Sequence, residues 1–214
     1  MGTPSSSPSS TVSASVSSSA SQTPSPSPSL EIGDEQIITV EEAKLHLRVL
    51  GNDDDSLIDS YIDAATAWAM EYQGRKYLTE TCVDYFDRWP AIIRPRWSPL
   101  LAVTSIRYID SAGTWQTLSD SYYDVDIDSE PGRIVEAYNC SWPGVRGDAN
   151  GIEVTYTAGY GSDADDVPAD IRNAILLLVG DWYGNREDIV TGTIVSHIPT
   201  GVKALLGIRR LFHV

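Results

Sequence analysis

The chain has 214 residues, with 30 acidic and 15 basic side chains and a net charge of −15 at pH 7. Because phosphate binding needs clustered lysines and arginines, this balance argues against general nucleic-acid binding, although an acidic wall can line a passage for DNA without holding it. No apolar run reaches a membrane-spanning length, so we expect no membrane partner.

Residues 1–30 are rich in serine and proline and contain no charged side chain. Such a segment buries too little apolar surface to offset the entropy of ordering its backbone, so we expect a low-complexity arm that is disordered or extended. The remaining residues, 31–214, have the length of one compact domain.

Two helices are predicted after the arm. Thr39 and Glu42 have the spacing of a capping box, which begins a short helix over VEEAKLHLRV that we expect to end at Gly51. The next segment, NDDDSLIDSYIDAATAWAMEYQGRKY, opens with acidic residues, repeats apolar residues at helical spacing, and is expected to stop at Gly74. Together these helices form a helical hairpin.

The middle of the chain changes to short runs of β-branched and aromatic residues separated by turn signals. The sequence around DSAG and around SEPGR predicts hairpin turns. We therefore expect a small, mostly antiparallel sheet of about four to six strands. The runs are TCVDYFDRW, VTSIRYID, YYDVDID, GRIVEAY and IEVTYTAGY.

A long helix is predicted over VPADIRNAILLLVGDWYGNRE, residues 167–187, with Pro168 in its first turn. Its core-facing stripe consists of Ile171, Ala174, Ile175, Leu178, Val179 and Trp182. Leu176, Leu177, Gly180 and Tyr183 widen the apolar surface beyond what one stripe requires. Such a helix is either deeply buried in its own subunit or packed against a neighbouring one.

The chain ends with PTGVKALLGIRRLFHV, which predicts a short amphipathic helix. Its apolar side would be formed by Val202, Leu205, Leu206, Ile208 and Leu211, and Lys203, Arg209 and Arg210 place positive charge on an otherwise acidic protein. With the hairpin, the middle sheet and the long helix, this gives an α+β fold class.

The sequence contains no catalytic constellation. His46, His197 and His213 lack a metal-binding spacing, no G-x-S-x-G elbow occurs, and Cys82 and Cys140 fit no C-x-x-C pattern. Asp124, Asp126 and Asp128 alternate as in a calcium loop, but Ser129 replaces the required Gly, and a strand with three solvated aspartates explains the pattern better. We expect no cofactor, no metal and no enzymatic activity.

The order and spacing of several motifs resemble the head–tail connector (adaptor) proteins of long-tailed bacteriophages and gene transfer agents. The resemblance covers residues 37 to 212 and excludes the serine- and proline-rich arm. The motifs are the TVEEAKLHLRV opening, SLIDSYIDAATAW, SPLLAVTSIRYIDSAGTWQTL, YYDVDIDSEPGRI, VTYTAGYG before the long helix, and a closing P-x-G-V-x-x-L-L-x-x-x-R over residues 199–210.

This resemblance implies a structural role in the virion neck, with assembly in the host cytoplasm. Copies would form a ring, twelvefold in such proteins, beneath the portal, extending the DNA channel and presenting a platform to a stopper or tail protein, with DNA passing through without specific binding. Two other assignments stay open: another neck or tail-completion module (a stopper or tail terminator), and a metal-dependent hydrolase that uses Asp124, Asp126 and Asp128.

The resemblance also assigns site residues. Residues 198–214 would be the docking segment, with portal contacts carried by Val202, Lys203, Leu205, Leu206, Ile208, Arg209, Arg210 and Leu211. A ring requires an interface between copies, to which we assign Leu177, Trp182, Tyr183 and Arg186.

Overall fold

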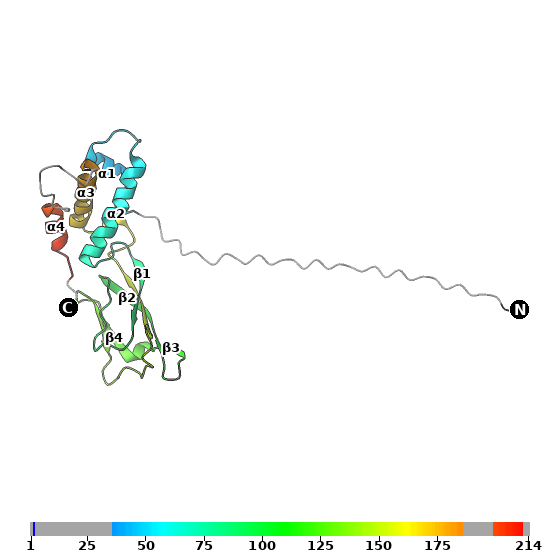
Figure 1. Cartoon of the computed structure of the whole chain (residues 1–214). Helices are drawn as coiled ribbons and strands as arrows, with labels where there is room; N and C mark the ends of the chain where they lie inside the picture. The colour runs from blue at the N-terminus through cyan, green and yellow to red at the C-terminus, as the bar shows by residue number, and fades with distance from the viewer. Residues whose placement is uncertain (1, 3–35, 186–198, 212–214) are drawn as a thin grey trace. The chain divides into compact units, whose positions relative to one another are not determined.

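A computed structural model describes residues 2, 36–185 and 199–211 of the chain. Its four helices lie together at one end of the region from residue 36 to residue 211, and its strands lie at the other end (Figure 1). Each group packs around a hydrophobic core of its own. The α+β class predicted from the sequence is therefore confirmed.

The N-terminal helical hairpin consists of α1 (Val40–Leu47) and α2 (Asp55–Gln73). At the start of α1, the Thr39 hydroxyl accepts a hydrogen bond from the Glu42 amide at 3.2 Å. α2 ends as predicted, because Gly74 adopts a left-handed φ of 70° and donates to the Met70 carbonyl. The buried stripe of α2 is formed by Ile58, Ile62, Ala65, Ala69 and Gln73.

Two details of α1 differ from the prediction. The helix ends at Leu47 rather than near Gly51, because Arg48 adopts the left-handed conformation (φ 59°) and its amide, with that of Val49, closes the last turn. The Glu42 side chain does not complete the capping box and instead accepts two hydrogen bonds from Arg172 on α3, at 3.1 and 3.0 Å. The contact with α3 thus replaces the Glu42 half of the predicted capping box, whereas the Thr39 half forms.

The strands form one four-stranded sheet, in the order β1-β6-β2-β3, and a two-stranded sheet of β4 and β5, with every pairing antiparallel. The predicted DSAG turn joins β2 to β3, and there the Asp110 carboxylate accepts from the amides of Ala112 and Thr114. The five predicted runs become strands, together with the short β3. Their bounds are β1 Glu80–Phe86, β2 Leu100–Ile109, β3 Trp115–Thr117, β4 Tyr123–Asp126, β5 Arg133–Glu136 and β6 Ile152–Ala158.

The long helix, α3 (Ala169–Gly184), follows a single 3-10 turn at Ala164–Asp166 and has Pro168 at its N-cap. It packs against α1, α2 and α4, which explains why its apolar surface is wider than one stripe. Leu176 is buried, and Gly180 lies next to His46 of α1, whereas Leu177 remains 42% exposed. Most of the surplus apolar surface is thus covered within the same subunit.

The C-terminal helix, α4 (Thr200–Gly207), is shorter than the sequence predicts. It ends before Arg209 and Arg210, so these two basic residues follow the helix instead of lying on one of its faces. None of the helices within residues 36–185 and 199–211 is long and apolar enough to cross a membrane.

Candidate functional site

The C-terminal segment packs against the subunit's own helices. Val202 and Leu206 of α4 are completely buried in the helical core, and Leu205 is half-buried beside it. Their burial fixes α4 against α2 and α3. Val202 and Leu206 therefore cannot contact another protein while α4 stays in this position, and the docking assignment of the other six residues stays a prediction.

The backbone of the C-terminal segment is held by Gln73, the last residue of α2. Although polar, Gln73 is fully buried. Its side-chain amide donates to the Leu206 carbonyl at 2.8 Å, and its side-chain oxygen accepts from the Tyr77 hydroxyl at 2.8 Å. The Leu211 amide in turn donates to the Gln73 carbonyl at 3.0 Å. The segment is thus held at two points, Leu206 and Leu211, which are five residues apart.

Arg75 connects three distant parts of the chain. Its side chain is almost fully buried, and its Nε donates to the Arg209 carbonyl at 2.6 Å. Both of its Nη atoms donate to the Glu130 carboxylate, which lies between β4 and β5. These hydrogen bonds hold the pKa of the Glu130 carboxyl below its usual range, so the pair remains charged at neutral pH. Arg75 therefore joins the C-terminal segment to the strand-bearing end.

The two basic residues after α4 also have defined positions. Arg209 is paired with Asp170, in the first turn of α3, at 2.9 Å. The guanidinium carbon of Arg210 lies 4.4 Å from the centre of the Tyr72 ring, a cation–π contact. Tyr72 also stacks on Trp68 of the same helix. Two further residues assigned to docking are accessible to solvent: Lys203 is exposed, and Ile208 is 73% exposed.

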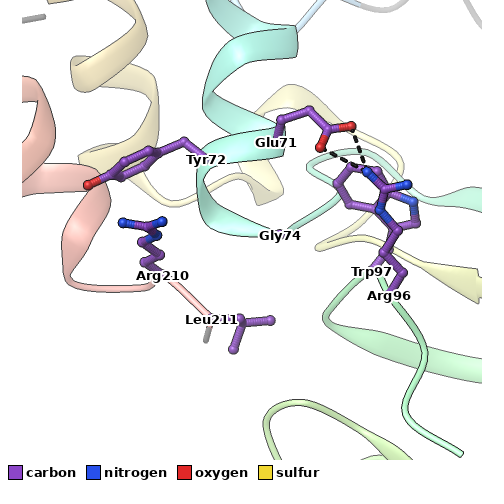
Figure 2. Close-up of a pocket in the computed structure, with 7 residues that line it drawn as sticks. All are labelled: Glu71, Tyr72, Gly74, Arg96, Trp97, Arg210 and Leu211. Carbon is purple, nitrogen blue, oxygen red and sulfur yellow. Dashed lines mark hydrogen bonds and ion pairs between the residues drawn. The ribbon is translucent and has the colours of Figure 1, made fainter. Parts of the chain in front are cut away.

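A pocket of about 410 Å³ opens where α2 ends, between the C-terminal segment and the loop before β2 (Figure 2). In Figure 2, Tyr72, Arg210 and Leu211 lie on one side of it, and the ion pair of Glu71 with Arg96, next to Trp97, lies on the other. The full lining is Glu71, Tyr72, Gly74, Arg96, Trp97, Arg210 and Leu211. Five of the basic residues of this acidic chain, namely Arg75, Lys76, Arg96, Arg209 and Arg210, gather at this end of α2.

Three of the four residues assigned to a subunit interface lie in the described part of the chain, and each of the three is partly exposed. Trp182 is half-buried and meets the Tyr61 ring edge-on, at 6.3 Å between ring centres. The Tyr183 hydroxyl donates to the Asp54 carboxylate at 2.6 Å. Leu177 remains the most exposed of the three, and Arg186 lies outside the described residues. The interface assignment stays a prediction.

The three alternating aspartates are not gathered around a metal-sized space. Asp124 and Asp126 lie on β4, whereas Asp128 follows the strand. The Asp126 carboxylate accepts hydrogen bonds from Ser129 and Arg133, and these lower its pKa to about 2. Within residues 36–185 and 199–211, no three acidic, histidine or cysteine side chains could hold a metal ion together. Cys82 and Cys140 are both free thiols.

The sequence did not identify Gln73, Arg75, Glu130 and the pair Arg96–Trp97. For Gln73 a signal was present, because the buried positions of α2 recur at residues 58, 62, 65 and 69 and the next helical step is residue 73. A polar residue at such a position needs buried partners. For Arg75 and Glu130 the sequence offers no comparable signal, since their contacts join residues far apart in the chain.

Comparison with known proteins finds a family match in the N-terminal part of the chain. Residues 37–93 match the model of a family described as "Phage gp6-like head-tail connector protein". That segment contains α1, α2 and β1 and extends to Ile93. The resemblance to head–tail connectors that the sequence motifs predict is therefore confirmed over this part of the chain.

Solved structures extend the likeness to most of the fold. A chain in the virion of the native gene transfer agent (GTA) particle is 24% identical and superposes with a TM-score of 0.68, over 83% of this chain and 91% of that one. A chain in the neck of the empty GTA particle, computed with C6 symmetry, is 25% identical with a TM-score of 0.65 over 83% and 91%. A chain in the neck of the native GTA particle, computed with C12 symmetry, is 23% identical with a TM-score of 0.64 over 82% and 89%. No curated protein matches the chain.

Proposed function

We propose that this chain is a structural protein of the virion neck, a head–tail connector that forms a ring beneath the portal, extends the DNA channel and joins the head to the tail or to the next neck protein. The observation that carries this proposal is the pairing of a connector-family match over residues 37–93 with a fold like that of GTA neck chains over most of the sequence. Assembly takes place in the host cytoplasm, and the mature location is the portal vertex.

The helices of this subunit favour a connector over a stopper or a tail terminator. A subunit without a helical hairpin and without the helix over residues 168–184 would favour those alternatives, which are more β-rich. The chain has both features, as α1 with α2 and as α3. A metal-dependent hydrolase has less support, because the Asp126 carboxylate already accepts hydrogen bonds from Ser129 and Arg133. We therefore propose no enzymatic role.

The proposed partners follow from charge and position. A ring of subunits that each carry −15 presents mostly acidic walls, which repel phosphates and let DNA slide without specific binding. The basic end of the chain provides the opposite sign for an acidic portal surface, which favours orientation on docking. Within residues 199–211, portal contacts are assigned to six of the predicted docking residues that are not fully buried: Lys203, Leu205, Ile208, Arg209, Arg210 and Leu211.

Electron microscopy of the purified protein mixed with the portal protein of its own virus tests this function. We expect a ring, twelvefold in symmetry, seated on the portal with the C-terminal segments at the contact. A subunit that never binds the portal, or that binds only at the tail end of the neck, would contradict the connector role and favour a stopper or tail terminator.

A further inference from the structure

The pocket at the end of α2 has two aromatic walls, each covered by a guanidinium group. Arg210 lies 4.4 Å from the ring centre of Tyr72, and Arg96 lies 5.0 Å from that of Trp97. Leu211 adds apolar surface between them. Tyrosine, tryptophan and arginine are the residue types that most often dominate binding energy at protein interfaces.

The walls come from separate parts of the chain, and hydrogen bonds hold the backbone that carries each of them. On one side, Leu211 is fixed through its amide to the Gln73 carbonyl. On the other, the Arg96 amide donates to Asp84 at 2.8 Å and the Trp97 amide donates to the Tyr156 hydroxyl at 3.2 Å. A pocket whose walls are fixed before binding loses little conformational entropy when it is filled.

At the rim of the pocket, Arg96 can exchange its ion pair with Glu71 for one with a carboxylate of a binding partner. The Arg96 and Glu71 side chains are 61% and 62% exposed, and both hydrogen bonds to Glu71 come from the Nη2 atom of Arg96. A guanidinium has five N–H donors, so Arg96 can bind a further carboxylate through its other nitrogens. An exposed pair contributes at most about 1 kcal/mol, so replacing Glu71 by a partner's acid costs little.

We propose that this pocket is a socket for the portal protein and receives an aromatic or aliphatic side chain that stands next to an Asp or Glu. Leu211 and the accessible parts of Tyr72 and Trp97 fit the first group, and the Arg96 guanidinium fits the carboxylate. A volume of about 410 Å³ has room for one large side chain and a flanking acid. The docking surface is then composite, made of the C-terminal segment together with Arg96 and Trp97, and this inference rests on the proposed connector function.

Charge reversal on the rim tests the socket without disturbing the core. Arg96→Glu in the full-length protein should weaken binding to the purified portal by at least about tenfold, as expected for a residue that dominates an interface. Arg88→Glu is the matched control, because Arg88 is also exposed, does not line the pocket and gives the same change in net charge. Trp97→Ala is the second variant, with Tyr85→Ala, an aromatic residue that is 53% exposed on β1, as its control.

The outcomes separate the socket from the function itself. Equal portal affinities of Arg96→Glu and Arg88→Glu, with wild-type binding intact, would overturn the socket and leave the connector role standing. Loss of ring formation in Arg96→Glu, measured by sedimentation, with unchanged portal binding would show that a second copy fills the pocket, and would also overturn the proposal. A wild-type protein that neither forms rings nor binds the portal would remove the connector function instead.

Discussion

At the scale of single residues, two polar side chains near the end of α2 decide where the C-terminal segment lies. Gln73 and Arg75 bond to backbone carbonyls of that segment, at Leu206 and Arg209, rather than to its side chains. These two contacts therefore do not depend on which side chains follow α4. Both contacts span more than a hundred residues, which is why periodicity along the sequence predicts the helix but not its anchoring role.

Replacing Tyr77 by Phe tests the buried hydrogen-bond chain with the loss of a single oxygen. Tyr77 is fully buried and donates to the Gln73 side chain at 2.8 Å, and burial raises the pKa of its hydroxyl, so it remains a donor at neutral pH. Tyr77→Phe leaves a buried acceptor unsatisfied and should lower the free energy of unfolding by about 1–3 kcal/mol. Urea denaturation measures this change.

The control for Tyr77→Phe is the same substitution at Tyr138, whose side chain is 96% exposed. Tyr138→Phe should stay within about 0.5 kcal/mol of the wild type, because surface changes away from structural features have small effects. Equal effects at the two positions would mean that the Gln73 contact contributes nothing to stability.

At the scale of whole elements, hydrophobic periodicity predicts what forms but not always what it faces. The alternating runs become strands and the long apolar segment becomes α3, because burying one face of each element is a local requirement. The resemblance assigns the apolar side of α4 to the portal, yet Val202 and Leu206 face the subunit's own core. An amphipathic pattern predicts that one face of a helix is buried, but it does not identify the surface that buries it.

This placement predicts opposite consequences for two apolar residues of the C-terminal segment. Leu206→Ala removes a fully buried side chain and should cost about 2–5 kcal/mol of unfolding free energy, through lost burial and a cavity. Ile208→Ala, at a side chain that is 73% exposed, should change stability by less than about 0.5 kcal/mol while weakening portal binding. Thermal unfolding and portal pull-down distinguish the two effects.

If Leu206→Ala unfolds like the wild type, α4 does not pack on α2 and α3 in solution. The same packing makes deletion of residues 199–214 a poor test of docking, since the deletion also uncovers the helical core that Val202 and Leu206 close.

At the scale of the whole molecule, a ring subunit must present two different surfaces that meet head to tail. The helical end leaves several large apolar side chains in water: Leu45 is 81% exposed, Leu50 98% and Leu177 42%. Isolated exposed leucines are common on protein surfaces, so exposure alone does not define an interface. Leu177 stands out because it lies on α3, whose other apolar residues are mostly buried.

Leu177→Asp therefore tests whether α3 forms part of the contact between copies. In the ring, this change would place a charge against a neighbour's apolar surface, and burying an unpaired charge is strongly unfavourable. We expect sedimentation to show a shift from rings to single subunits, with thermal unfolding of the subunit nearly unchanged because Leu177 is already accessible to water.

The control is Asn173→Asp, one helical turn earlier at another exposed position of α3. It adds the same charge and should leave ring formation intact. Rings that persist in Leu177→Asp would move the interface away from α3, whereas equal loss in both variants would point to net charge rather than to a specific contact.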